Sequence, residues 1–450
     1  IQDGLVNGDM FAYVELKKRI EDEMTKASAA FDYFRREQLN LLGSHADLIK
    51  AKREINQRLA TIRVLLDRQL YATNGGGKTY DQWHKDTQPF HWYTEFYPVM
   101  AQRGGFDVII GNPPYVKVSV AEERYRIPNF VTKECANLYA CVAERCYSLS
   151  RTVSKVGMIV QLPIVCTDGM RKIQEILGMR RCWFLTFDDR PGKLFDDLTH
   201  IRCTIFLTGE GYGLQATKYN RWYSNARESL FANMAFSSVK LSGNISSIPK
   251  IGAIILRTIS NKMAKKLLLA HFMAGRYNLY YHNAPQYFIR VTKDRPYFWN
   301  EKDGEKQSVS IKTCLFNDKD NRDVGCAVLN SSLFYVWFVM LSDCRHLNVR
   351  EIENFPFDFD LLPCADKKDL ISLSDELMAD YEIHKIRKAT YYKTTGKVVY
   401  DEYYPKYSKP IIDKIDELLA KHYGFTEEEL DFIINYDIKY RMGDELNKND

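Results

Sequence analysis

Asn112, Pro113, Pro114 and Tyr115 combine groups that could act on an amino group carried by a planar ring. An asparagine side-chain carbonyl accepts hydrogen bonds, and so does the backbone carbonyl of a proline, which has no N–H of its own. Asn112 and Pro113 could therefore accept both hydrogens of an exocyclic amino group such as N6 of adenine. The nitrogen lone pair, otherwise delocalised into the ring, would then become nucleophilic, as methylation requires. Tyr115 supplies a ring that can stack on a base flipped out of a helix.

The residues before this tetrapeptide predict the element that positions it. Residues 106–110 are rich in β-branched and aromatic side chains, and we expect a buried parallel strand that ends at Gly111. In an open parallel sheet, ligands bind beyond the carboxyl ends of the strands. The tetrapeptide would therefore lie at a site, with Asn112 and Tyr115 projecting into it. A tight Pro-Pro turn after an ordinary buried strand, without a function, is the alternative.

The tetrapeptide resembles the catalytic motif of amino-group methyltransferases that use S-adenosylmethionine. Its context resembles the type IIG restriction–modification enzymes and related phage-defence DNA adenine-N6 methyltransferases. The other similar segments lie on both sides of the motif, and the resemblance covers most of residues 90 to 440. They are Phe90-His91-Trp92, Glu95-Phe96, Pro98-Val99, Asn137-Leu138-Tyr139 with Glu144, Gly157-Met158-Ile159-Val160 with Pro163, Tyr297-Phe298, Asn300-Glu301, residues 330–335 and Asn354-Phe355-Pro356.

This resemblance implies a reaction and a set of site residues. Asn112 and Pro113 would hold the amino group, S-adenosylmethionine would donate the methyl group, and Tyr115 and Phe195 would enclose the flipped base. Aromatic stacking of this kind is worth about 1–3 kcal/mol for each base. Pro114 and Val142 would border the cofactor, although the family more often has an aromatic residue at the place of Val142. If Phe195 does not stack on a base, it is an ordinary core residue at a strand end.

The length and composition are those of a globular protein with about three domains. Hydrophobic residues make up 45% of the 450 and charged residues 27%, and no apolar run approaches the roughly 20 residues that a membrane span needs. The ten cysteines include no C-x-x-C pair, so we expect reduced thiols and no metal site. We expect a cytoplasmic protein that does not bind membranes.

The predicted fold is α/β: a partial Rossmann-like methyltransferase sheet with a helical hairpin insertion, then a mixed α+β target-recognition domain and a helical C-terminal segment. Strands are expected near residues 157–162, 182–187 and 200–208, alternating with helices. The expected boundaries give four parts: 1–89 (hairpin), 90–210 (catalytic half), 211–360 (target recognition) and 361–450 (helical). Since no strand–glycine turn–helix unit precedes residue 106, we expect the cofactor-binding half, and any nuclease, to lie upstream.

Residues 211–300 predict a surface that binds double-stranded DNA. This segment holds thirteen lysines and arginines but only two acidic residues, Glu228 and Asp294, whereas the whole chain has a net charge of +5. Tyrosines are interleaved with the basic residues, and a basic, aromatic surface suits phosphate contacts and base stacking. The candidate DNA contacts are Lys262, Lys265, Lys266, Arg290, Lys293 and Arg295; an ordinary solvated surface is the alternative.

Three other functions share parts of this pattern. The same turn serves enzymes that methylate a glutamine side chain in release factors, but these are compact and lack a long basic domain. Methylation of cytosine N4 is chemically close and more often goes with Ser in place of Asn112. Finally, a chain without its cofactor-binding half could bind DNA without any activity of its own.

Overall fold

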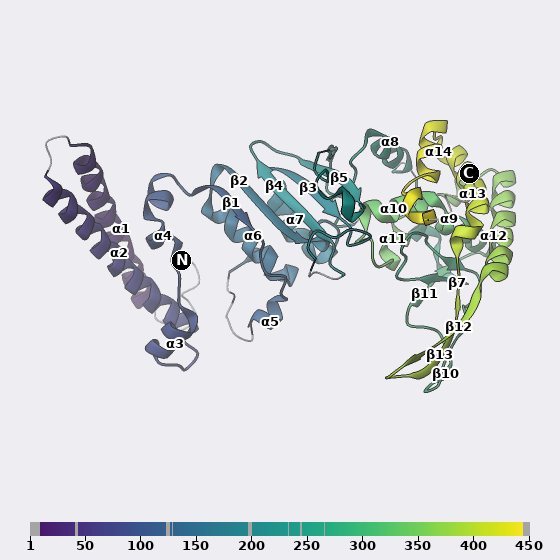
Figure 1. Cartoon of the computed structure of the whole chain (residues 1–450), viewed down its shortest axis with the longest axis horizontal. Helices are drawn as coiled ribbons and strands as arrows, with labels where there is room; N and C mark the ends of the chain where they lie inside the picture. Colours follow the sequence, from purple (N-terminus) through teal and green to yellow (C-terminus); the bar gives the residue numbers. More distant parts are fainter. Residues whose placement is uncertain are drawn as a thin grey trace. The chain divides into compact units, whose positions relative to one another are not determined.

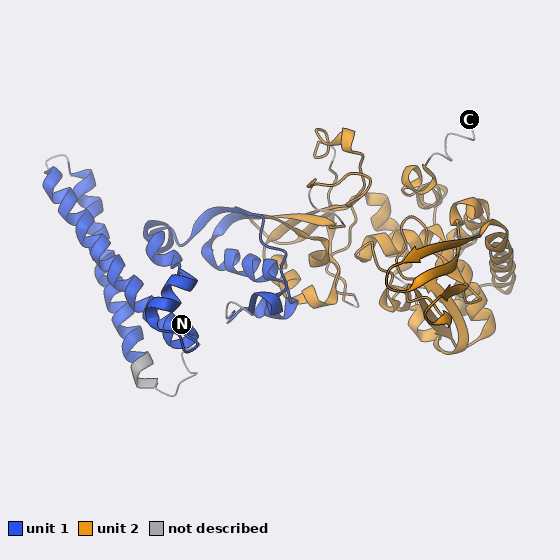
Figure 2. Cartoon of the chain, turned by 60° about the horizontal axis from the view of Figure 1, so that its bottom comes forward, with its two compact units in different colours: residues 1–157 blue, residues 158–450 orange. Residues whose placement is uncertain are grey.

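The computed structural model describes residues 10–40, 44–122, 127, 129–196, 200–232, 234–243, 245–264 and 266–443. The chain divides into two compact units, residues 1–157 and 158–450, which Figure 2 shows in different colours. Both units contain helices and strands, so the predicted α/β class is confirmed. The four-part division with boundaries at residues 89, 210 and 360 stays a prediction.

Unit 1 begins with two long helices that lie side by side as the predicted hairpin (Figure 1): α1 (Met10–Leu39) and α2 (His45–Asn74). Their apolar faces meet at Ala27 and Ile62, which are completely buried and pack with Tyr97. Ser44 caps α2, because its side chain accepts a hydrogen bond from the backbone N–H of Asp47. The expected helical hairpin is therefore present.

The rest of unit 1 leads to the strand that carries the tetrapeptide. Its elements are α3 (Tyr80–Thr87), α4 (Trp92–Glu95), the π-helix Pro98–Gln102, β1 (Phe106–Gly111), α5 (Val118–Glu122), the 3₁₀ helix Val131–Cys135, α6 (Leu138–Leu149) and the first part of β2 (Ser150–Gln161). Strand β1 pairs with β2, and Asp107 of β1 forms an ion pair with Arg151 of β2. Gly105 allows the chain to enter β1, because a Cβ there would lie 2.5 Å from the carbonyl oxygen of Leu149.

The burial predicted for β1 is wrong. Strand β1 is the terminal strand of its sheet, and the side chains of Val108 and Ile110 are 55% and 82% exposed. A β-branched sequence suits a pleated surface with packing partners on both faces, but it does not itself supply those partners. Among the described residues no strand pairs with the other edge of β1, and this strand exposes an apolar face in unit 1.

Unit 2 contains a mixed sheet in which the end of β2 is followed in the strand order by β4, β3, β5 and β6. The bounds of these strands are Arg181–Phe187 (β3), Cys203–Gly209 (β4), Leu214–Asn220 (β5) and Ser237–Val239 (β6), and α7 (Arg171–Gly178) precedes β3. Strand β3 pairs antiparallel with β4 and parallel with β5. The predicted strands are present, but in the described residues no helix separates β3 from β4, so the expected regular alternation fails there.

Two smaller sheets lie further along unit 2. One has the order β11-β7-β8, with bounds Met273–His282 (β7), Val291–Thr292 (β8) and Ile311–Phe316 (β11). The other has the order β10-β9-β13-β12, with bounds Phe298–Asn300 (β9), Gly304–Glu305 (β10), Ile386–Tyr392 (β12) and Gly396–Glu402 (β13). The hairpin β12–β13 falls within the region that we expected to be helical, and β13 joins a strand about a hundred residues earlier in the chain.

The remaining helices of unit 2 include α10, which is fully buried. They are α8 (Ile254–Met263), α9 (Lys319–Asn330), α10 (Ser332–Leu341), α11 (Val349–Glu353), α12 (Cys364–His384), α13 (Lys409–Tyr423), α14 (Glu427–Ile434) and α15 (Ile438–Met442). All ten residues of α10 are buried. Asp416 of α13 accepts hydrogen bonds from the backbone N–H groups of Ser332 and Leu333, both at 3.1 Å, and so satisfies the first turn of α10.

Taken singly, none of the described helices has both the length and the hydropathy that a membrane span requires. Helices α9 and α10 reach them only as a pair, and this pair is bent by 68°.

A buried ion-pair cluster connects the large sheet of unit 2 with the helices of that unit. Arg221, which follows β5, donates a hydrogen bond to Asp188 at 2.8 Å, to the hydroxyl of Tyr335 at 2.6 Å and to Asp437. Burial opposes the charged forms, but Tyr335, Asp437 and Asp188 keep the pKa of Arg221 raised. The Arg221 and Arg202 guanidinium groups likewise keep the pKa of Asp188 lowered. This cluster fixes the carboxyl ends of β3 and β5 to α10.

Candidate functional site

The tetrapeptide follows β1 directly and has no regular secondary structure. Pro113 is buried, whereas Asn112 and Pro114 are exposed and Tyr115 is partly buried. Within the described part of the chain, the Asn112 side chain makes no hydrogen bond. Its amide oxygen and nitrogen are therefore free to bind a ligand, as the predicted chemistry requires.

The start of α6 holds the segment that follows the tetrapeptide. The backbone N–H of Leu138 donates to the carbonyl of Val116 at 2.8 Å, and the N–H of Val118 donates to the carbonyl of Ala136 at 3.0 Å. The ring of Tyr115 meets the buried ring of Tyr139 edge to face, with centroids 6.2 Å apart at 88°. Edge-to-face pairs at this distance are favourable, so this contact gives Tyr115 a defined position.

Glu144 connects α6 to the 3₁₀ helix 131–135. Its carboxylate accepts hydrogen bonds from the backbone N–H of Thr132 at 2.8 Å, from the Thr132 hydroxyl at 2.6 Å and from the N–H of Val131 at 3.2 Å. Asn137, at the N-cap of α6, accepts from the N–H of Tyr139. The residues that resemble the motif's downstream context are thus the ones that fix the Tyr115 segment within unit 1.

An apolar cavity of about 550 Å³ lies beside β1 in unit 1. Val142 contributes to its lining together with residues of β1 and α6, whereas Pro114 does not. The lining residues that the structure describes include no carboxylate, so the ribose hydroxyls of S-adenosylmethionine have no acidic acceptor there. The cavity suits the apolar parts of that cofactor only, and the described residues do not make a complete binding site for it.

Phe195 lies in unit 2, in a turn after β3, and is partly buried. Arg227 holds this turn, since its guanidinium donates to the carbonyls of Lys193 at 3.1 Å and Leu194 at 2.7 Å. Because Tyr115 belongs to unit 1, the stacking of both rings on one base stays a prediction.

The six candidate DNA contacts differ in how free their charges are. Lys262 is paired with Glu429 at 2.6 Å, and Lys293 lies between Asp323 at 3.2 Å and Asp375 at 2.5 Å. These two lysines are therefore largely committed within the protein.

Of the other four candidates, Arg295 is exposed and pairs with Glu305 at 3.4 Å, and Lys266 is partly exposed with no carboxylate of the described residues within 4 Å. Lys265 lies outside the described residues. Arg290 lines a cavity with Tyr403, which the sequence did not indicate because the two residues are more than a hundred positions apart. Among the described candidates, Lys266 and Arg295 thus have the most accessible charges.

The sequence of residues 20–183 matches the protein-family model of the Eco57I restriction-modification methylase. This range includes Asn112 to Tyr115 and α6, and it ends before Phe195. A search of curated protein sequences found no match.

Several solved structures of restriction–modification enzymes are similar to this chain at low TM-scores. A nuclease-deletion mutant of the Type ISP enzyme LlaGI with a DNA substrate mimic is 10% identical, covers 80% of this chain and 52% of its own, and has a TM-score of 0.36. The DrdV–DNA complex is 10% identical and has a TM-score of 0.31, and the match covers 66% of this chain and 47% of that one. The type IIG endonuclease BpuSI is 9% identical and has a TM-score of 0.26, and the match covers 73% of this chain and 54% of that one.

The chain spans about half the length of these three proteins. At such TM-scores the likeness supports no shared structural detail, whereas the family match rests on the sequence itself. The part of the chain that contains Asn112 to Tyr115 is therefore similar to the methylase domain of restriction–modification enzymes.

Proposed function

We propose that this chain is part of a site-specific DNA methyltransferase that transfers a methyl group from S-adenosylmethionine to N6 of adenine. One observation carries the proposal: the Asn112 amide is exposed and uncommitted at the end of β1, beside a tyrosine that α6 holds in place. The sequence match of residues 20–183 to a restriction-modification methylase supports the same reaction class.

In the proposed reaction, the side-chain oxygen of Asn112 and the backbone carbonyl of Pro113 accept the two hydrogens of the adenine amino group. These bonds withdraw the nitrogen lone pair from the ring and direct it outward as the nucleophile. Tyr115 stacks on the flipped base, and Phe195 is the proposed partner on its other face. S-adenosylmethionine, when bound, supplies the electrophilic methyl group.

Pro114 and Val142 remain the proposed cofactor contacts of this chain. Val142 lines the apolar cavity beside β1, which suits the uncharged parts of the cofactor. Since that lining offers no carboxylate among the described residues, we propose that groups outside it bind the ribose and the methionine end. The unpaired edge of β1 is where further strands could complete such a site.

We propose double-stranded DNA as the partner, bound in part by the basic segment 211–300. Lys266 and Arg295 are the described candidates whose charges are most accessible, and Lys265 is a further candidate. Cations in this segment outnumber acids by thirteen to two, which favours a polyanion over the protein substrate of a glutamine methyltransferase.

A methyl-transfer assay separates the candidate functions. The chain is incubated with S-adenosylmethionine labelled in the methyl group, and with either double-stranded DNA or a glutamine-containing peptide from a release factor. Label in DNA supports the proposal, and label in the peptide alone would establish the glutamine alternative. DNA binding without transfer to either substrate would favour a binding fragment that lacks activity of its own.

A further inference from the structure

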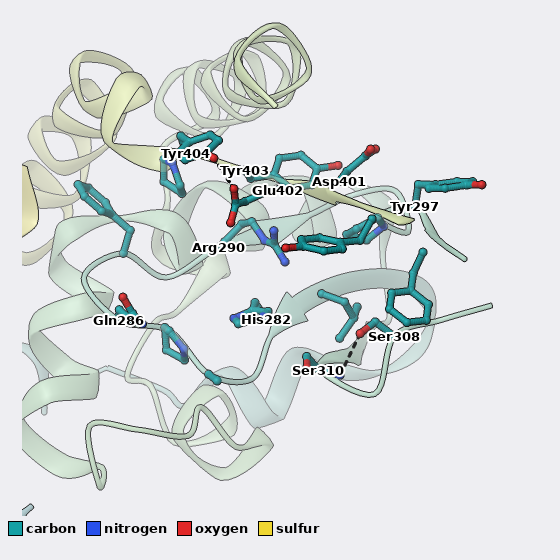
Figure 3. Close-up of a pocket in the computed structure, with 18 of the residues that line it drawn as sticks. His282, Gln286, Arg290, Tyr297, Ser308, Ser310, Asp401, Glu402, Tyr403 and Tyr404 are labelled. Atoms are coloured by element: carbon teal, nitrogen blue, oxygen red, sulfur yellow. Dashed lines mark hydrogen bonds between the residues drawn. The ribbon is translucent and has the colours of Figure 1, made fainter. Parts of the chain in front are cut away.

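A cavity of about 670 Å³ lies in unit 2 between the two smaller sheets. One wall comes from the end of β7 and the loop that follows it, and the other comes from β9, β13 and the residues after β13 (Figure 3). Cavities that bind small ligands usually occupy about 300–1,000 Å³. The cavity is thus large enough for more than a single inorganic anion.

The two carboxylates at this cavity are already neutralised by other residues. Asp401 receives two hydrogen bonds from Arg387, at 2.7 and 3.1 Å, and pairs with Lys385 at 3.1 Å. Glu402 pairs with Lys388 and accepts a hydrogen bond from Tyr404. Burial opposes the charged carboxylates, but these partners outweigh it and lower the pKa of both. A ligand would therefore meet two carboxylates whose charges are balanced.

Arg290 is a cation of the lining that forms no ion pair among the described residues, although the charge of Glu402 acts on its pKa. Among the described residues, no carboxylate lies within 4 Å of its guanidinium, and its side chain donates no hydrogen bond. It lies over the ring of Tyr403 at 4.7 Å and points among the lining residues, with His282 on one side and Glu402 on the other (Figure 3). Burial lowers the pKa of Arg290, yet a guanidinium stays charged at neutral pH. An unpaired, partly buried cation requires an anion to balance it.

The remaining lining is mainly aromatic, with two further cations, Lys406 and Arg441. Tyrosine and phenylalanine rings line the cavity: Tyr287, Phe288, Tyr297, Phe298, Tyr392, Tyr400, Tyr403 and Tyr404. Burial and the nearby charge of Arg290 lower the pKa of His282 to about 4, so this imidazole is neutral at pH 7. Ser308 and Ser310 supply further hydrogen-bonding groups. The lining therefore matches a ligand that combines one anionic group with a planar ring.

We propose that this cavity binds one nucleotide, with its phosphate on Arg290 and its base among the tyrosine rings. The phosphate pairs with the otherwise unbalanced guanidinium, and the base replaces water against aromatic faces. Such a nucleotide could be free in solution or could be one unit of a nucleic-acid strand. Methyl transfer is not required for this binding, so the assignment is independent of the function proposed for Asn112.

Isothermal titration of the whole chain tests the assignment with three separate probes: dAMP, deoxyadenosine and inorganic phosphate. We expect dAMP to bind at one site, and at least tenfold more tightly than either of its parts. The variant Arg290→Gln should bind dAMP at least tenfold more weakly. The matched control Arg36→Gln, which changes an exposed arginine of α1 outside the cavity, should change the affinity less than twofold.

The melting temperature distinguishes loss of the site from loss of the fold. Because Arg290 makes no ion pair, Arg290→Gln should melt at the same temperature as the parent chain or higher. Titration with a short single-stranded oligodeoxyadenylate identifies the source: tighter binding than dAMP supports a nucleic-acid strand, and weaker binding supports a free nucleotide. Unchanged dAMP affinity in a folded Arg290→Gln variant, or no dAMP binding at millimolar concentration, would overturn the assignment.

Discussion

Replacing Glu144 with alanine should release residues 131–135 from α6, the helix that also holds Tyr115. The substitution removes three hydrogen bonds to a carboxylate, at 2.6, 2.8 and 3.2 Å. A bond to a charged group contributes about 1.5–3 kcal/mol when buried. Since Val131 is exposed and water replaces part of the loss, we expect the local free energy of opening to fall by about 3 kcal/mol in total.

Hydrogen exchange of the backbone amide of Thr132 measures this effect directly. A loss of about 3 kcal/mol corresponds to roughly a hundredfold faster exchange. Glu144→Gln keeps one acceptor oxygen but places an NH₂ group against a donor, so exchange should accelerate only about tenfold. Glu134→Ala, which removes an exposed carboxylate from the same turn, should leave exchange unchanged. If Glu144→Ala exchanges at the parent rate, the carboxylate does not hold this turn and the reasoning fails.

Three further predictions concern the entry to β1, the helical core and the DNA surface. Gly105→Ala should lower the free energy of unfolding in urea by about 3 kcal/mol, because φ is +125° and the new Cβ would lie 2.5 Å from the Leu149 carbonyl oxygen. The control Gly104→Ala should lower it by only about 1 kcal/mol, because no atom lies within 4 Å of the new Cβ. Burial raises the pKa of Asp416 to about 6 from its usual 3.8, so its stabilising effect is complete below pH 3.8 and is lost as the pH rises through 6. Between pH 5 and pH 7, the unfolding free energy of the parent chain should fall by about 1.3 kcal/mol relative to that of Asp416→Asn. A parent chain that instead gains stability relative to Asp416→Asn over this range would contradict the prediction. Lys266→Glu should weaken DNA binding and reduce the steepness of the slope of log affinity against log salt concentration by about 0.9 or more. An unchanged slope would show that the DNA does not contact Lys266.

The elements that local signals specify were predicted well. The helical hairpin of α1 and α2 and the strand β3 were expected from the sequence and are present. The strand before Asn112 was also predicted, because β-branched residues followed by glycine and prolines identify it within a few positions. Its burial could not be predicted, since burial depends on which segments pack against the strand.

Pairings between distant segments account for the other differences. Strand β13 joins β9 about a hundred residues earlier, so the β12–β13 hairpin, and with it the tyrosine wall of the cavity beside Arg290, was missed. Contacts with distant residues also limited the prediction of DNA contacts in residues 211–300. Counting charges over residues 211–300 could not reveal that Lys262 is paired with Glu429, because that carboxylate lies far outside the segment. Net charge predicted a class of partner, but not which cations remain free.

The modified base itself tests the central claim most directly. The gene that encodes this sequence is expressed in a host without adenine methylation, either unchanged or with Asn112→Ala, and the host DNA is digested to nucleosides and analysed by mass spectrometry. We predict N6-methyladenine with the unchanged protein and none with Asn112→Ala at equal amounts of folded protein. N6-methyladenine that persists with Asn112→Ala would contradict the assigned role of the amide. Methylated cytosine in place of methylated adenine would contradict the proposed target.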